Sequence, residues 1–459
     1  MLKKILNNPL LMQSFWSLIA RFTGVALNFA VILIITNKLP KSSAGDILLL
    51  MTFVTGVALI SRLGIDQLLM KEVASAHDSD LDFRRGFLAV SYKAVLILSF
   101  IFMIIWLLSS SFVQTSFFEN NGQITISINE LMFASLGVLF FNLVILNSTY
   151  LKAIKQSVIG ILGQNALTAI TFLFLIIVFW KYFSNDQYTI LLYIFSLILA
   201  GIIAFFITRY YSTAKTTLIP KSGGGAIHPT PETDDVDNEK ISTLSLPSIV
   251  DVIKKSIPLA PVSIISFLMI FTDTIMVGWF LANEQVAEYS VASKISYIVL
   301  FFLQAMEAVI YPRLLNMYQH KQTHLRAFFW QSTALVVAVV LSITLFMYLL
   351  SDWILIAFGE EYIIAKYSLG LLLLAQLFRA ASITFSFMFI IREKVKFLNI
   401  ILVTAFISNV VCNIVFIQLY GINGAALATL IANAILLTLV LILFYSKNLL
   451  KNTRTETQA

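Results

Sequence analysis

Residues 212–252 read STAKTTLIPKSGGGAIHPTPETDDVDNEKISTLSLPSIVDV, and they form the only long polar stretch of this 459-residue chain. The stretch contains three consecutive glycines, four prolines and an acidic cluster from Glu232 to Glu239. This composition leaves too little apolar surface to offset the entropy lost on ordering. We therefore predict a flexible connector between two similar halves, residues 1–211 and 253–446, with a short tail at 447–459.

The rest of the chain is strongly hydrophobic. Apolar residues make up 59% of the sequence, charged residues only 12%, and the mean hydropathy is +0.89. Soluble proteins are about 45–50% apolar and about 25% charged. The sequence therefore predicts an all-α integral membrane protein and excludes a soluble globular domain.

Apolar runs long enough to cross about 30 Å of hydrocarbon, at roughly 1.5 Å per residue, predict about twelve helices, six in each half. The predicted spans are 11–36, 45–70, 86–109, 130–150, 157–180 and 188–209, then 257–281, 287–311, 326–350, 365–391, 397–418 and 423–446. The first run is too long for a signal peptide and lacks a small-residue cleavage site, so we expect it to be retained.

The sequence offers no metal, cofactor or ATP site. Cys412 is the single cysteine and falls inside a predicted helix, which excludes a disulfide or thiolate metal site within one chain. The four histidines all fall between predicted spans, and His320 and His324 are more simply a solvated pair. No GxxxxGK[ST] phosphate loop occurs, which argues against direct ATP hydrolysis.

Basic residues give the orientation. With the predicted spans, twenty-two Lys and Arg residues fall on one side of the membrane and four on the other. The four are Lys38, Lys41, Lys181 and Lys366. Positive residues accumulate on the cytoplasmic side, so we expect both termini and the connector to be cytoplasmic. The net charge of +7 then reflects topology and anionic lipid, and no nucleic acid partner is expected.

The two halves repeat each other at an offset of about 242 residues. SAGDILLL (43–50) aligns with VAEYSVA (286–292), and Arg84 aligns with Arg326. LKAIKQ (151–156) likewise aligns with IREKVK (391–396). Because each half has an even number of spans, the copies must point the same way. We predict a parallel pseudo-two-fold repeat about an axis along the membrane normal.

Eight charged residues fall inside the predicted spans and away from the span ends. They are Arg21, Arg62, Lys93, Lys294 and Arg379, with Asp66, Asp273 and Glu307. Each costs about 2.5–3.5 kcal/mol or more in mid-membrane when it faces lipid, so such residues usually face a cavity or a partner. By depth, we expect Arg21, Asp273 and Arg379 to line a cavity.

Simpler roles exist for four of these charges. Arg62 and Asp66 are four residues apart on one helix and could neutralise each other. Lys93 and Lys294 could instead extend toward the headgroups.

The excess of buried cations over acids suggests an anionic cargo. Arginine suits phosphate because its planar guanidinium donates paired hydrogen bonds and stays ionised. We predict that Arg21, Arg62, Lys294 and Arg379 bind substrate. Ion coupling would involve Asp66, Asp273 or Glu307, with a proton or sodium as the counter-ion. Amides on the same helices could bind sugar hydroxyls or join helices: Asn28, Asn142, Asn147, Gln164, Asn165, Gln304, Gln376, Asn409 and Asn413.

Several stretches resemble the polysaccharide flippases, the polysaccharide-transport branch of the superfamily that includes the multidrug and toxin extruders. The matching stretches are LPKSSAGDILLL (39–50), SRLGIDQLLMKEVA (61–74), FTDTIMVGWF (271–280), VAEYSVASKIS (286–296), FGEEY (358–362) and YGINGAALAT (420–429). The resemblance covers essentially the whole chain and depends on the order and spacing of these pieces. The long connector departs from the compact family pattern.

The resemblance implies a twelve-helix, two-lobed fold with a cationic central cavity. It further implies that the chain moves an undecaprenyl-pyrophosphate-linked oligosaccharide from the inner to the outer leaflet by alternating access, for surface polysaccharide synthesis. Asp66 and Asp273 fall on family motif positions. The implied location is the bacterial cytoplasmic membrane, and the implied partners are membrane lipid and other polysaccharide-assembly proteins.

Two rival functions remain open at this stage. A cation-coupled multidrug exporter of the sister branch should prefer an acidic, aromatic cavity, which the buried positive excess disfavours. A membrane-embedded polysaccharide polymerase or ligase normally needs a large outer loop with catalytic or basic side chains. The longest predicted outer loop, 110–129, contains no Lys or Arg, so we predict a transporter and no catalytic residue.

Overall fold

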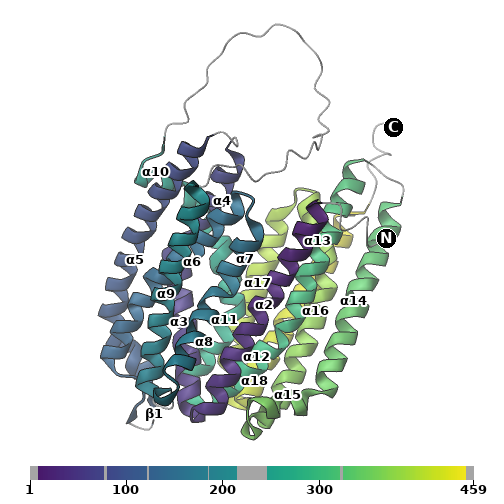
Figure 1. The fold of residues 1–459 in the computed structure, drawn as a ribbon. Coiled ribbons are helices and arrows are strands. Elements are labelled where there is room, and N and C mark those ends of the chain that lie inside the picture. Colours follow the sequence, from purple (N-terminus) through teal and green to yellow (C-terminus); the bar gives the residue numbers. More distant parts are fainter. Residues whose placement is uncertain are drawn as a thin grey trace, which may run out of the picture.

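The computed structural model describes residues 9–76, 80–120, 123–183, 186–213, 246–320 and 324–450. Most of the predicted connector, His77, His228 and the end of the predicted tail lie outside these residues. The described chain is almost entirely helical, and its long helices lie side by side in one bundle (Figure 1). The predicted all-α membrane fold is confirmed.

The first half contains the elements α2 (Pro9–Lys38), α3 (Lys41–Ser61), α4 (Ile65–Ser75), α5 (Leu81–Phe117), β1 (Glu119–Asn120), β2 (Gln123–Ile124), α6 (Ile128–Ala153), α7 (Ser157–Asn165), α8 (Leu167–Val178), η1 (Trp180–Tyr182) and α9 (Asp186–Thr213). A short helix, α10 (Ile249–Ser256), and a 3-10 turn, η2 (Ile257–Leu259), lead to the second half. That half contains α11 (Ala260–Phe280), α12 (Asn283–Ser296), α13 (Ile298–Gln319), α14 (Leu325–Leu349), α15 (Ser351–Phe358), η3 (Glu360–Ala365), α16 (Lys366–Ile391), α17 (Val395–Tyr420) and α18 (Ile422–Ser446).

Within the described residues, ten helices are long and apolar enough to cross a membrane, and the bent pair α7 and α8 would make an eleventh. The remaining predicted span, 257–281, corresponds to the 21-residue helix α11, whose apolar stretch among the residues with described side chains is Leu268–Phe280. The count of twelve therefore stays a prediction.

Three predicted spans are interrupted in the structure. The span 45–70 breaks between α3 and α4, where Leu63 has φ 45° and Gly64 has φ 77°. A Cβ at position 64 would lie 2.8 Å from the backbone nitrogen of Ala260, so close packing as well as backbone conformation requires glycine. The other two breaks are a 51° bend between α7 and α8 and a turn at Tyr297 between α12 and α13.

The third helix is longer than the sequence suggested. We predicted a span at 86–109 and a loop at 110–129, but α5 runs for 37 residues to Phe117 and a two-stranded antiparallel hairpin follows. The Gln114 side chain donates a hydrogen bond to the Ile126 carbonyl (2.9 Å), and the buried Trp106 indole donates to the Leu131 carbonyl (2.8 Å). The first of these bonds satisfies a polar side chain of the segment that was predicted as a loop.

Corresponding helices of the two halves pack in corresponding pairs. Thus α6 packs on α9 as α16 packs on α18, α5 on α6 as α14 on α16, and α2 on α7 as α11 on α17. The turns after α6 and α16 also match, because Lys155 and Glu393 both have positive φ (67° and 57°). In each turn the following N–H bonds back five residues, Gln156 to Leu151 (2.9 Å) and Lys394 to Phe389 (2.7 Å). These features fit the predicted repeat, which remains a prediction.

The helix α10 crosses the predicted boundary between connector and second half, and it packs on the first half. Val252 is buried against α4 and α5. A capping box joins Ser248 and Asp251 at its start, and the hydrogen bonds from Ser248 lower the pKa of Asp251 below its ordinary value. The first half therefore holds the segment that leads into α11.

The bundle has two distinct ends (Figure 1). We call the end that carries α4 and α10 the α10 end, and the opposite end, with the β1–β2 hairpin and α15, the α15 end. The α15 end contains Lys38, Lys41, Lys181 and Lys366, the four basic residues assigned to the outer side. At this end the halves meet closely, because α3 packs along α12 and α11.

Candidate functional site

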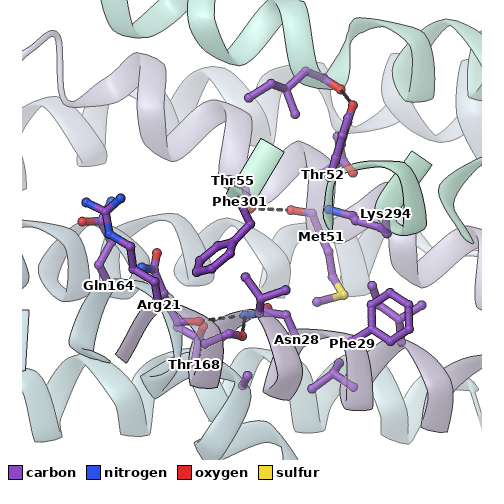
Figure 2. A pocket seen from close by; sticks show the side chains of 18 of the residues that line it. Arg21, Asn28, Phe29, Met51, Thr52, Thr55, Gln164, Thr168, Lys294 and Phe301 are labelled. Atoms are coloured by element: carbon purple, nitrogen blue, oxygen red, sulfur yellow. Dashed lines mark hydrogen bonds between the residues drawn. The ribbon is translucent and has the colours of Figure 1, made fainter. Parts of the chain in front are cut away.

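A cavity of about 830 Å³ lies between the two halves. Its walls come from α2, α3, α4, α6, α7, α8 and α9 of the first half and from α11, α12 and α13 of the second. Figure 2 shows Arg21 and Gln164 on one side of this cavity and Lys294 on the opposite side. The site is therefore shared by both halves.

Three cations line the cavity: Arg21, Lys152 and Lys294. Arg21 Nη1 donates a long hydrogen bond to Gln304 Oε1 (3.4 Å), whereas Lys152 Nζ donates a short one to Gln164 Oε1 (2.5 Å). Lys294 Nζ lies 5.0 Å from the centre of the Phe271 ring. No Asp or Glu occurs among the described lining residues, so the walls carry positive charge alone.

The three cations lie at different depths. Counted along their helices at about 1.5 Å per residue, Lys152, Arg21 and Lys294 lie roughly 36, 25 and 16 Å from the α15 end. Neighbouring cations are thus separated by about 10 Å along the membrane normal. A bound anion could pass from one cation to the next without a long step through an uncharged region.

The bend between α7 and α8 places polar groups in the cavity wall. Asn28 Nδ2 donates to the backbone carbonyls of Asn165 (2.7 Å) and Gly24 (2.8 Å), and so joins α2 to the bend. A Cβ at Gly24 would lie 2.6 Å from the Asn165 Cβ, so glycine allows this approach. Gln164 and Thr168 lie on either side of the bend and present polar groups to the cavity (Figure 2).

The structure places two of the four predicted substrate-binding cations, Arg21 and Lys294, in the cavity wall. Lys152 is a further lining cation. It follows the predicted span 130–150 and was therefore counted among the cytoplasmic basic residues, whereas in the structure it is the second residue from the end of α6. The four lining residues among the predicted amides are Asn28, Gln164, Asn165 and Gln304. The Gln164–Asn165 pair in the middle of an apolar run was the sequence signal for the polar bend.

Arg62 lies away from the cavity, in a polar network inside the first half. Its Nη1 donates to Asn142 Oδ1 (2.7 Å), and its Nε lies 3.9 Å from Asp66 Oδ2. Asn142 in turn donates to Ser61 Oγ (2.7 Å) and Ser99 Oγ (2.8 Å). The arrangement agrees with mutual neutralisation of Arg62 and Asp66, the simpler role considered above.

Arg379 and Glu307 are not among the residues that line the cavity. Glu307 interacts electrostatically with Arg379 and Arg21, so it lies close enough to influence the cavity from outside its wall. Lys93 is exposed on α5, which agrees with an extension toward the headgroups.

Asp273 lies at the centre of a buried polar cluster in the second half, formed by α11, α12, α17 and α18. Asp273 Oδ1 accepts hydrogen bonds from Asn409 Nδ2 (3.0 Å) and Asn413 Nδ2 (2.6 Å). Its Oδ2 accepts from Tyr289 Oη (2.9 Å) and from the Thr429 hydroxyl. The two asparagines had been considered as sugar ligands, but the structure uses them to hold a carboxylate.

One oxygen in this cluster lacks a partner. Asn413 Oδ1 is buried, and no donor among the described residues reaches it. A carboxylate and an unpaired amide oxygen in one buried cluster are oxygen ligands of the kind that hard cations prefer. The cluster can therefore hold a proton on Asp273 or a small cation among these oxygens.

The comparisons with known proteins agree with this architecture. A family model described as polysaccharide biosynthesis protein matches residues 10–318. The chain is similar to the probable low-salt glycan biosynthesis flippase Agl15 of Haloferax volcanii, with 27% identity over 175 residues. That alignment covers 36% of this chain and about a third (35%) of the length of the curated relative.

Solved structures share the fold at low sequence identity. The lipid II flippase MurJ in an inward closed conformation superimposes with a TM-score of 0.68 at 14% identity, over 96% of this chain and 89% of that one. An inward-facing MATE multidrug transporter gives 0.68 at 13% identity, over 95% and 99% of the two chains. An outward-facing MATE transporter gives 0.59 at 16% identity, over 96% and 97%.

The chain shares its fold with MurJ and with the MATE transporters. Because the family model covers two thirds of the chain, the chain belongs to the polysaccharide biosynthesis protein family.

Proposed function

We propose that this protein is a flippase that moves a polyprenyl-pyrophosphate-linked oligosaccharide across the cytoplasmic membrane by alternating access. The observation that carries the proposal is the cavity of about 830 Å³ whose described lining residues include three cations and no acid. Its charge requires a negatively charged ligand, and its amide and hydroxyl groups suit sugar hydroxyls.

A pyrophosphate fits the cations better than a carboxylate or a cationic drug does. Arg21 offers a planar pair of donors, and the lysines offer compact charges at two other depths. Burial of cations without a counter-charge is costly in a membrane, so a diphosphate would gain from each cation as it reached that depth. The MATE transporters that share the fold raise the alternative of drug export, but a cationic drug would be repelled by this wall.

The contact between α2 and α13 suggests how a headgroup enters while its tail stays in lipid. At this wall the Arg21–Gln304 hydrogen bond is long, 3.4 Å, and Phe22 packs on Phe301 and Phe302 with ring centroids 4.1 and 5.9 Å apart. These are side-chain contacts, which can part without breaking a backbone hydrogen bond. Separation of α2 from α13 would open the cavity sideways to the membrane.

We propose that the α10 end faces the cytoplasm, because the basic residues accumulate there. Coupling to a proton or sodium gradient would act through the Asp273 cluster, which has the unpaired Asn413 oxygen. Asp66 is engaged with Arg62 and Glu307 lies outside the cavity wall, so both fit coupling less well than Asp273. Other polysaccharide-assembly proteins would supply the substrate and consume the product.

A transport assay with purified protein tests the proposal directly. The protein is reconstituted into vesicles together with a fluorescent polyprenyl-pyrophosphoryl oligosaccharide, and a membrane-impermeant enzyme that cleaves the exposed sugar is added outside. We expect cleavage of nearly all of the lipid with the protein and of only the outer leaflet without it. If the protein leaves the inner leaflet protected at every ion gradient tested, the function is wrong. A new covalent sugar product would instead favour the polymerase or ligase.

A further inference from the structure

Lys41 is the centre of the contacts that join the two halves at the α15 end. It is the first residue of α3, and its Nζ lies 2.5 Å from the Glu288 carboxylate on α12. The same Nζ donates a hydrogen bond to the Glu361 carbonyl (3.3 Å) and lies 5.6 Å from the centre of the Tyr362 ring. One first-half cation thus contacts two separate elements of the second half, α12 and η3.

The FGEEY turn of the second half, residues 358–362, packs against the cavity-lining helix α2 at this end. Phe358 is buried and packs edge-on against Phe29, a cavity-lining residue of α2, with ring centroids 5.0 Å apart. Asn37 Nδ2 of α2 donates to the Ala357 carbonyl (2.8 Å). The turn needs Gly359, whose φ is 129°. These contacts hold the turn against the first half.

The backbones of the two halves also touch at this end. A Cβ at Gly45 of α3 would lie 1.8 Å from the Asn283 carbonyl oxygen of α12. Asp46 accepts hydrogen bonds from the Asn283 amide and from Thr125 Oγ1 (3.0 Å). The cavity therefore cannot open toward the α15 end unless α3 and α12 separate.

The charges of the ion pair are shielded from water. The side chains of Lys41 and Glu288 expose only 17% and 8% of their surface. Loss of one partner of such a pair leaves a buried charge without compensation, whereas loss of both partners leaves no buried charge and removes this free-energy cost. The closed contact is thus stable only while both charges are present or both are absent.

We propose that Lys41 holds an outer gate closed, by pairing with Glu288 and by binding the FGEEY turn, and that this contact breaks when the cavity opens toward the α15 end. The proposal rests on the proposed function only for its orientation, with the α15 end outside. It makes the Lys41–Glu288 pair a determinant of which side the cavity faces, with no role in binding the cargo.

The test measures access to the cavity from the α15 end. Thr52 lines the cavity on α3, so a Thr52→Cys reporter is placed in a Cys412→Ser background. A membrane-impermeant thiol reagent is applied to right-side-out and to inside-out vesicles. Glu119→Cys, exposed on the hairpin at the α15 end, establishes which vesicles present that end.

We expect slow labelling of the parent from the α15 end. Lys41→Gln and Glu288→Gln should each raise the labelling rate several-fold from that end and lower it from the other. The labelling rate of the double variant, Lys41→Gln with Glu288→Gln, from the α15 end should be lower than that of either single variant. Lys41→Arg should be labelled at the same rate as the parent. The control is Lys366→Gln, which breaks an ion pair at the same end but inside the second half (Lys366 Nζ to Asp352 Oδ2, 2.8 Å).

Equal labelling of parent and single variants, or the same increase with Lys366→Gln, would overturn the gate. Folded protein is confirmed by the elution profile of each variant, and Lys41→Arg keeps the test valid if a neutral variant does not fold. Because labelling needs no substrate, a correct gate with no transport would contradict the proposed function alone. Normal transport with unchanged labelling would contradict the gate alone.

Discussion

Tyr289 Oη donates a 2.9 Å hydrogen bond to Asp273 Oδ2, and the residue before it, Glu288, forms the ion pair with Lys41. The next residue, Ser290, lines the cavity. Three consecutive residues of α12 thus serve three places: Glu288 joins the two halves, Tyr289 binds the buried carboxylate and Ser290 lines the cavity. A rotation or shift of α12 would change all three together.

A first prediction concerns this connection. Tyr289→Phe removes one of the four hydrogen bonds to Asp273 and leaves the Lys41–Glu288 pair intact. We expect the gate to lose its response to the coupling ion, because the carboxylate no longer contacts α12. The measurement is Thr52→Cys labelling from the α15 end in sodium, in potassium and at several pH values. The parent should respond to one of these changes and Tyr289→Phe should not.

The matched variant for this prediction is Tyr297→Phe. Tyr297 also belongs to the turn after α12, but its hydroxyl donates to the Ile270 carbonyl (2.6 Å) and does not bond to Asp273. It should keep the ion response. A response that survives Tyr289→Phe would show that the carboxylate acts through α17 or α18 instead.

A second prediction concerns the cavity cations. Arg21→Glu combined with Lys294→Glu should abolish export of surface polysaccharide while protein levels stay normal. A hydrogen bond to a charged group contributes about 1.5–3 kcal/mol, so loss of each contact should reduce transport roughly tenfold to hundredfold. Polysaccharide is measured in a complemented deletion strain. Lys181→Glu, a basic residue exposed at the α15 end, is the control. Full export by the double variant would count against the cavity as the substrate site.

A third prediction separates Arg62 from the binding cations. Arg62→Gln should lower stability, because Asn142 and Asp66 lose a buried partner at a cost of about 1–3 kcal/mol. Export per folded molecule should stay close to that of the parent, because Arg62 lies outside the cavity wall. Thermal unfolding of the detergent-purified protein gives the first quantity. If Arg62→Gln has a normal melting temperature but no export, Arg62 is a substrate ligand after all.

A fourth prediction compares two glycines where the halves meet. Gly45→Ala would place a Cβ against the Asn283 backbone of α12, so α3 and α12 must separate and the cavity should become accessible from the α15 end. Gly278→Ala would meet only the tip of the Leu49 side chain, at 2.7 Å, which can adjust by rotation. Labelling of Thr52→Cys should therefore rise with the first substitution and change little with the second. A larger rise in labelling with Gly278→Ala than with Gly45→Ala would mean that α11, rather than α12, closes this end.

Much of the fold could be predicted because hydrophobic length and the placement of Lys and Arg are properties of the sequence alone. The breaks could not be predicted in the same way. The segment 157–180 reads as one apolar run, and its bend depends on Asn28 of another helix, which binds the Asn165 carbonyl. The break at Gly64 likewise depends on the approach of Ala260, far along the chain.

The site was predicted in part for a related reason. Arg21 and Lys294 were identified because a charge inside a predicted span needs a polar neighbour wherever the helix lies. The same rule grouped them with Arg62 and Arg379. Depth favoured Arg21, Asp273 and Arg379, of which only Arg21 lines the cavity, since depth does not show which face of a helix meets the cavity. Lys152 was missed because a cation near a helix end resembles a topology signal, and only the packing of α6 on α7 directs it to Gln164.

The packing of α10 on the first half brings both described ends of the connector to α5. Arg85 bonds to the Ser212 carbonyl through Nε (2.7 Å) and Nη2, and Leu246 packs on the neighbouring Gly86. The chain therefore leaves α9 and returns before α10 at adjacent positions on one helix. A guest domain whose own termini lie close together could be spliced between these points without stretching either lobe, which offers a site for a fluorescent reporter or a fiducial protein.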